Sequence, residues 1–159
     1  MAAGDTHRHA RREDAEAVFL NGALVTILTP GAWSGGGFSL VEVLMPAGRA
    51  TPLHTDESDE TLHVIEGAIR VHVDGDEVRA GPGDQIAVRR LVPHAFLADG
   101  GRARVLCLNF PRAHDGFFRE AGTPAVVRDL AAAPPPDPVR MRAAAARHGV
   151  TILGPPPFR

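Results

Sequence analysis

The chain has 159 residues, a formal net charge of −2 and one cysteine, which suits a single domain that needs no disulfide cross-links. Its 17 basic residues are all arginine and form no basic stripe interleaved with aromatics, so we expect no nucleic-acid surface. We find no signal-peptide core and no apolar run of about eighteen residues, so we expect a cytoplasmic protein without a membrane segment. Cys107, inside the apolar run ARVLCLNF, favours a reducing compartment and a buried thiol.

The first two regions of the chain differ in pattern. Residues 1–17 are polar and charged, and we expect a flexible leader there. Residues 18–112 alternate short β-branched runs with glycine, proline and aspartate, which is typical of antiparallel strands. The runs are ALVTIL at 23–28, FSLVEVLM at 38–45, TLHVIEG at 61–67, AIRVHVDG at 68–75, QIAVRR at 85–90 and ARVLCLNF at 103–110. The strand count favours one all-β antiparallel jelly-roll barrel, with a tight hairpin at Asp74-Gly75-Asp76.

Residues 113–159 form a C-terminal extension of different composition. Asp137 as a cap and Pro138 in a first turn predict one short helix that ends near Gly149 and packs on the barrel or on a partner. The segment 150–153 is expected either to add a strand to the barrel edge or to pack across a partner. Phe117 and Phe118 are expected to anchor the extension on the barrel.

Four candidate metal ligands occur between residues 48 and 94. His54 and Asp56 lie two residues apart, so in an extended strand their side chains leave the same face. Glu60 begins the next apolar run after an acidic turn, and His94 begins a later strand after Val92-Pro93. Two imidazoles and a carboxylate on one face suit Fe(II) or a similar divalent ion. For Asp56, a role as ligand and a role as a base beside the ion both remain open.

The stretch GRATPLHTDESDETLHVIEG resembles the first motif of the cupin superfamily, in which a glycine, a His-x-His pair, a glutamate and a second glycine recur at fixed spacing. The matching positions are Gly48, His54, Glu60 and Gly67, with Asp56 where the family has its second histidine. The second cupin motif resembles Gly81-Pro82-Gly83-Asp84 leading to Pro93-His94, with Ala98 where the family usually has asparagine. HTDESDETLHVIEG, VPHAF and the tail from FFREAG to GPPP are similar to small bacterial quercetin-dioxygenase-like cupins.

The resemblance implies a double-stranded β-helix that holds one divalent metal ion through His54, Asp56, Glu60 and His94. Fe(II) is favoured over Mn(II), Ni(II) and Zn(II). Our first hypothesis is a metal-dependent, dioxygenase-like oxidoreductase acting on an aromatic, enol or polyketide-like small molecule. In that family the motif glutamate can shuttle a proton, a role that would fall to Glu60, with Asp56 as the other catalytic candidate.

Two alternatives stay open beside the oxygenase. With Asp56 in place of histidine, the site could catalyse isomerisation, cyclisation or a lyase reaction by acid-base chemistry. The other alternative is a cupin that binds a small molecule without turning it over. We also expect a homodimer, because sheet edges of such barrels commonly pair. Six residues are expected to supply an apolar lining or core: Phe38, Met45, Phe96, Leu106, Leu108 and Phe110.

Overall fold

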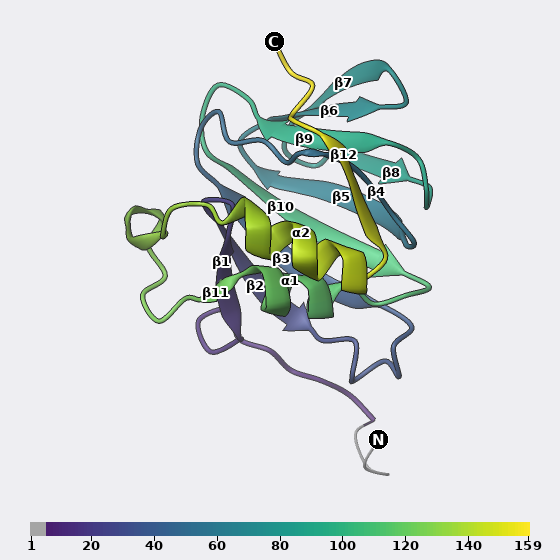
Figure 1. The fold of residues 1–159 in the computed structure, drawn as a ribbon. Helices are drawn as coiled ribbons and strands as arrows, with labels where there is room; N and C mark the ends of the chain where they lie inside the picture. Colours follow the sequence, from purple (N-terminus) through teal and green to yellow (C-terminus); the bar gives the residue numbers. More distant parts are fainter. Residues whose placement is uncertain (1–5) are drawn as a thin grey trace.

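The computed structural model describes residues 6–159 and contains two antiparallel sheets that face each other, with helices packed across one opening (Figure 1). The first sheet, in the order β11-β1-β2-β3-β10-β5-β8, comprises Thr123–Pro124, Ala17–Leu20, Ala23–Thr29, Ser39–Met45, Ala103–Phe110, Asp59–Glu66 and Gln85–Val88. The second sheet, in the order β12-β4-β9-β6-β7, comprises Val150–Gly154, Leu53–Asp56, His94–Ala98, Ile69–Val73 and Asp76–Ala80. Between β3 and β10 the chain passes repeatedly from one sheet to the other, so the predicted all-β jelly-roll arrangement is confirmed.

Alternation along the strands decides which side chains enter the space between the sheets. In β5 the buried side chains are Glu60, Leu62 and Val64, while the residues between them are half-buried. In β10 the same period buries Val105 and Cys107. The resulting core holds apolar side chains from both sheets, because a two-residue period sends every second side chain to the same face.

The hairpin between β6 and β7 turns at Asp74 and Gly75, whose φ angles are 49° and 91°. Two consecutive positive φ values match the right-handed twist of the flanking strands, as this pair of residues predicts. The strands β7, β8, β11 and β12 end the two sheets. Pairing of one of these edges with a second copy, and with it the expected homodimer, stays a prediction.

The C-terminal extension contains the predicted helix α2, Pro138–Arg147, in which Oδ1 of Asp137 accepts a hydrogen bond from the backbone N of Arg140 at 2.9 Å. It also contains α1, Asp115–Ala121, and a short 3-10 helix η1, Leu130–Ala132, two helices that the sequence pattern did not indicate. Neither was expected because both are short, and α1 includes a glycine of low helix propensity. Burial of Phe117 and Phe118 stabilises α1 despite its short length and its glycine.

After α2 the chain enters β12, which pairs antiparallel with β4 (Figure 1). Of the two arrangements considered for residues 150–153, the added edge strand is the one found. Strand β4 is therefore held between β12 on one side and β9 on the other. In the chain from residue 6 onward, we find no helix that combines the length and apolarity needed to span a bilayer.

The predicted leader, residues 1–17, lies partly outside the described residues. In its described part, Arg12 forms an ion pair with Glu42 on β3, and Arg8 donates a hydrogen bond to the carbonyl oxygen of Leu28 at 3.1 Å. Ala15 is buried against the barrel. These contacts attach the segment before β1 to strands β2 and β3 of the first sheet.

Candidate metal centre and cavity

Three of the four predicted ligands come from two neighbouring strands of the smaller sheet. His54 and Asp56 lie on β4, and His94 lies on β9 directly across from His54 in the strand pairing. The rings of His54 and His94 have their centroids 4.3 Å apart. Asp56 and His94 are almost fully buried, whereas His54 is half-buried. Cross-strand pairing thus brings together residues that are forty positions apart in the chain.

Backbone carbonyls orient both imidazoles. Nδ1 of His54 lies 2.9 Å from the carbonyl oxygen of Pro52, and Nδ1 of His94 lies 2.8 Å from that of Val92. Because a carbonyl oxygen only accepts hydrogen bonds, each Nδ1 must carry the proton. The lone pair of each neutral ring is then on Nε2, which is the arrangement that metal-binding histidines use.

Asp56 has one carboxylate oxygen engaged and one free. Oδ1 accepts hydrogen bonds from the backbone N of Ser58 at 2.8 Å and from its Oγ at 3.0 Å. Oδ2 is buried without a hydrogen-bond partner among the residues the structure describes. A buried carboxylate oxygen without a partner is costly, and a cation beside it would remove that cost. The residue therefore fits a metal ligand.

His54, Asp56 and His94 each offer a donor atom, and these atoms lie within 4.8 Å of one another. In residues 6–159 this is the one group of three or more such side chains gathered so closely. Glu60 is not part of the group, but its Oε2 lies 3.1 Å from Nε2 of His94. The structure thus brings three predicted ligands together and places the fourth against one of them.

Burial and charge act in opposite directions on the pair of Glu60 and His94. Burial favours the neutral form of each, but their mutual hydrogen bond and attraction lower the pKa of Glu60 to about 2 and raise that of His94 to about 9. The pKa of His54 is lowered by burial and by repulsion from His94. Without a metal, the proton therefore resides on His94, opposite an ionised Glu60.

A cavity of about 90 Å³ opens beside this group, between the two sheets and the helices of the extension. Most of its wall is apolar, with Met45 and Phe96 from the strands and Phe117 and Phe118 from α1. Polar groups reach it at separate points: Asn21, Arg49, Thr51, His54, Glu60 and His114. A small apolar space with a few converging polar groups is the usual character of a ligand site.

Of the six residues expected to form an apolar lining or core, Met45 and Phe96 do so and the other four do not. Phe38 is half-buried and packs edge-to-face against Trp33, with ring centroids 6.1 Å apart. Leu106 and Leu108 are half-buried and lie on the face of β10 opposite to Cys107, and Phe110 is exposed. The two-residue period of β10 explains the error, because the buried positions in this strand are the odd-numbered ones up to Asn109. Cys107 is buried, as predicted, and lines the cavity.

His114, which no sequence pattern singles out, also lines the cavity. It caps the start of α1, and its backbone N donates a hydrogen bond to Oγ of Ser39 at 2.8 Å. Its ring packs against Phe117 and Phe118, with ring centroids 5.1 Å apart in each case. The ring nitrogens form no hydrogen bond with any described side chain or backbone group. Burial lowers the pKa of His114, so the ring is neutral near pH 7. No motif spacing marks this residue, because the fold of the extension carries it to the site.

Residues 41–109, which include all four predicted ligands, match the family of the cupin domain. Over 90 residues the chain is 29% identical to quercetin 2,3-dioxygenase of Bacillus subtilis (strain 168), covering 56% of this chain and 27% of that enzyme. Residues 41–109 of this chain form a cupin domain. The matched part spans little more than a quarter of that relative, so the activity of the relative does not follow from the match.

Two solved structures share this architecture. KdgF from Halomonas sp. superposes with a TM-score of 0.61 and 22% identity, covering 70% of this chain and 98% of that chain. The polyketide cyclase RemF from Streptomyces resistomycificus superposes with a TM-score of 0.59 and 23% identity, covering 67% of this chain and 81% of that chain. At these identities the likeness concerns the fold.

Proposed function

We propose that this cupin is a metal-dependent oxygenase of the dioxygenase type, acting on a small substrate that carries an enol or phenol oxygen. The single observation that carries the proposal is the group of His54, Asp56 and His94 beside an apolar cavity. Two histidines and one carboxylate on one face of an ion leave other positions open, which is the ligand set of non-haem Fe(II) oxygenases. The similarity to a quercetin 2,3-dioxygenase supports the same reaction class.

The two Nε2 atoms and Oδ2 of Asp56 would hold the ion. A bound divalent ion would supply Lewis acidity toward a substrate oxygen and, in the case of iron, redox chemistry with dioxygen. We favour Fe(II), with Mn(II), Ni(II) and Zn(II) as the ions to compare. The carbonyls of Pro52 and Val92 hold the rings in place, so little reorganisation is needed on binding.

Glu60 is the proton acceptor that we propose for the substrate hydroxyl. Its side chain lines the cavity, and its Oε2 lies 3.1 Å from Nε2 of His94. A proton acceptor must be within hydrogen-bond reach of the group it serves, and this position lies beside the proposed ion. The apolar side chains of Phe96, Phe117 and Phe118 would exclude water from the reacting centre.

The test is oxygen uptake after metal loading under anaerobic conditions. We expect the Fe(II) form, given a panel of catechols, enols and β-diketones, to consume dioxygen with at least one class of substrate. The variant His54→Ala is expected to lose this activity. His63→Ala serves as the matched control, because His63 alternates with buried Glu60 and Leu62 on β5 and is half-buried. Absence of metal-dependent oxygen uptake in every metal form would contradict the proposal.

A second candidate is a non-redox isomerase, cyclase or lyase, and His114 is the observation that favours it. Glu60 and His114 both line the cavity, so two proton carriers could serve one substrate. Turnover that persists without oxygen and after chelation, and that falls at least about a hundredfold in His114→Gln, would favour this candidate. Strict dependence on oxygen would reject it.

A further inference from the structure

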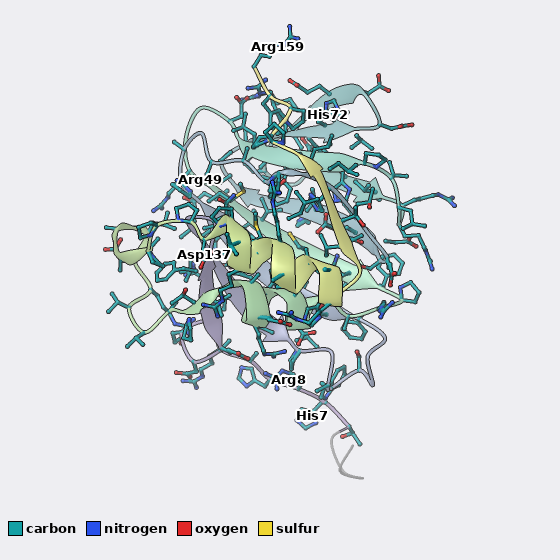
Figure 2. The ribbon with its side chains drawn as sticks, viewed as in Figure 1. His7, Arg8, Arg49, His72, Asp137 and Arg159 are labelled. Atoms are coloured by element: carbon teal, nitrogen blue, oxygen red, sulfur yellow. The ribbon has the colours of Figure 1, made fainter. Side chains whose placement is uncertain are left out.

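Arg49 stands where the inner cavity meets a second, outer hollow. The outer hollow measures about 460 Å³, and both spaces are lined by Asn21, Arg49, Ala50, Pro52 and Met141. Arg49 lies in the connection between β3 and β4 and is half-buried. Figure 2 shows it at the side of the barrel near the first turns of α2, the helix that carries Met141. A ligand entering the inner cavity from this side must pass its side chain.

The side chain of Arg49 is held over the turn between β1 and β2. A Cβ added at Gly22 would lie only 3.0 Å from Nε of Arg49, so the absence of a side chain at Gly22 makes room for the arginine. Asn21, in the same turn, donates a hydrogen bond from Nδ2 to the carbonyl oxygen of Ala50 at 3.0 Å. This bond ties the turn to the segment that follows Arg49. The guanidinium is therefore placed at the mouth by the packing of the turn.

No described carboxylate or carbonyl binds the guanidinium of Arg49. Arg70, which also lines the outer hollow, differs because Glu77 at 2.9 Å and Asp99 at 3.3 Å pair with it. Among the described residues that line the two spaces, Glu60 has the only acidic side chain, and it is engaged with His94. A half-buried arginine without a partner, in surroundings with no free acidic side chain, attracts an anion. Guanidinium binds a carboxylate through two parallel hydrogen bonds.

We propose that Arg49 binds the acidic group of the substrate, so that the cavity takes a compact carboxylate. The inner space of about 90 Å³ is smaller than the roughly 150 Å³ engineered cavity that holds benzene. The part of the ligand inside is therefore no larger than one ring, and a short acyl chain suits the space. This inference rests on the proposed function, which places the reacting end of the substrate at His54 and Glu60. It adds the chemical class of the substrate, a carboxylate.

The test compares carboxylates with their neutral amides, using benzoate against benzamide and hexanoate against hexanamide. Binding to the full chain is measured by calorimetry and ligand-observed NMR, both as purified and after removal of metal. We expect a carboxylate to bind about tenfold to a hundredfold tighter than its amide, in both states. In Arg49→Gln this preference is expected to fall to about unity, while Arg49→Lys keeps a smaller preference because the charge remains but the paired geometry is lost.

Arg102→Gln is the matched control, because it removes the same charge at an exposed ion pair with Glu66 that lines neither space. It is expected to keep the wild-type preference. Equal binding of acid and amide to the wild type, an unchanged preference in Arg49→Gln, or no binding of either acid at millimolar concentration would overturn the inference. Calorimetry with Mn(II) distinguishes the two proposals, since Arg49→Gln should bind the metal as the wild type does. If the wild type does not bind Mn(II), that result contradicts the proposed oxygenase function but leaves the proposed role of Arg49 intact.

Discussion

The cavity has two walls of different kinds. The strand wall, formed by β4, β5 and β9, carries polar groups that contact one another and are fixed by backbone hydrogen bonds. The helical wall, formed by α1, α2 and β12, is apolar apart from His114, whose ring has no hydrogen bond with any described group. The contrast indicates a division of roles. Strands β4, β5 and β9 carry the reactive polar side chains, and the extension shapes the cavity and excludes water from it.

The largest effect should follow from removing a ligand of the strand wall. We expect His54→Ala to weaken Mn(II) or Ni(II) binding at least about a hundredfold, because even residues that only orient a ligand contribute about tenfold to a hundredfold. Isothermal titration calorimetry measures the metal affinity, and the control variant His63→Ala should bind the metal as tightly as the wild type does. Equal metal affinity in His54→Ala and the wild type would remove this histidine from the site.

A substitution in the helical wall should lower the stability of the fold. Phe118 is 9% exposed and packs against Phe117 with ring centroids 5.7 Å apart. Phe118→Ala is expected to lower the free energy of unfolding by about 3 kcal/mol, because it enlarges a cavity in the core. Urea denaturation measures this value, and Val126→Ala, at a side chain that is 93% exposed, should leave it unchanged. A loss below about 1 kcal/mol would mean that α1 contributes little to the packing.

A smaller, graded effect should appear in the pH dependence of metal binding at the strand wall. A metal ion must displace the proton from His94, whose pKa is raised to about 9, so metal affinity should rise about tenfold per pH unit from pH 6 to about 9 and then level off. Titrations at four pH values measure the slope. An affinity that does not change with pH would show that metal binding releases no proton from His94.

The same pair should set the pH range in which the metal-free protein is most stable. The raised pKa of His94 stabilises the fold fully below its ordinary value of 6.5, and this contribution is lost as the pH rises through about 9. The lowered pKa of Glu60 stabilises the fold above its ordinary value of 4.5, and this contribution is lost as the pH falls toward about 2. The stabilisation from this pair should therefore be greatest between about pH 4.5 and 6.5.

The strand wall could be predicted from the sequence because strand geometry is local. The two-residue spacing of His54 and Asp56 fixes their common face once β4 is assigned, and the pairing of β4 with β9 then brings in His94. The two-residue period of β5 likewise turns Glu60 toward the interior of the barrel, together with Leu62 and Val64. It could not show that Glu60 contacts His94 through a hydrogen bond, because that depends on how the two sheets approach each other.

The helical wall could be predicted only in part. The cap at Asp137 and the proline after it marked α2, but α1 has no comparable signal and is stabilised by the aromatic pair that it buries. His114 reaches the cavity through the turn between β10 and α1, a placement set by contacts far apart in the sequence. Arg49 likewise gains its position from the packing of another turn.

Anaerobic titration of the wild type and of Asp56→Asn with Fe(II) tests the central claim most directly. Asparagine keeps an oxygen for the two hydrogen bonds from Ser58 but loses the charge on the buried oxygen that has no partner. We expect the wild type to bind one ion per chain and Asp56→Asn to bind it at least about tenfold more weakly. Equal affinity in the two proteins, or no saturable binding by the wild type, would contradict a metal centre formed by His54, Asp56 and His94.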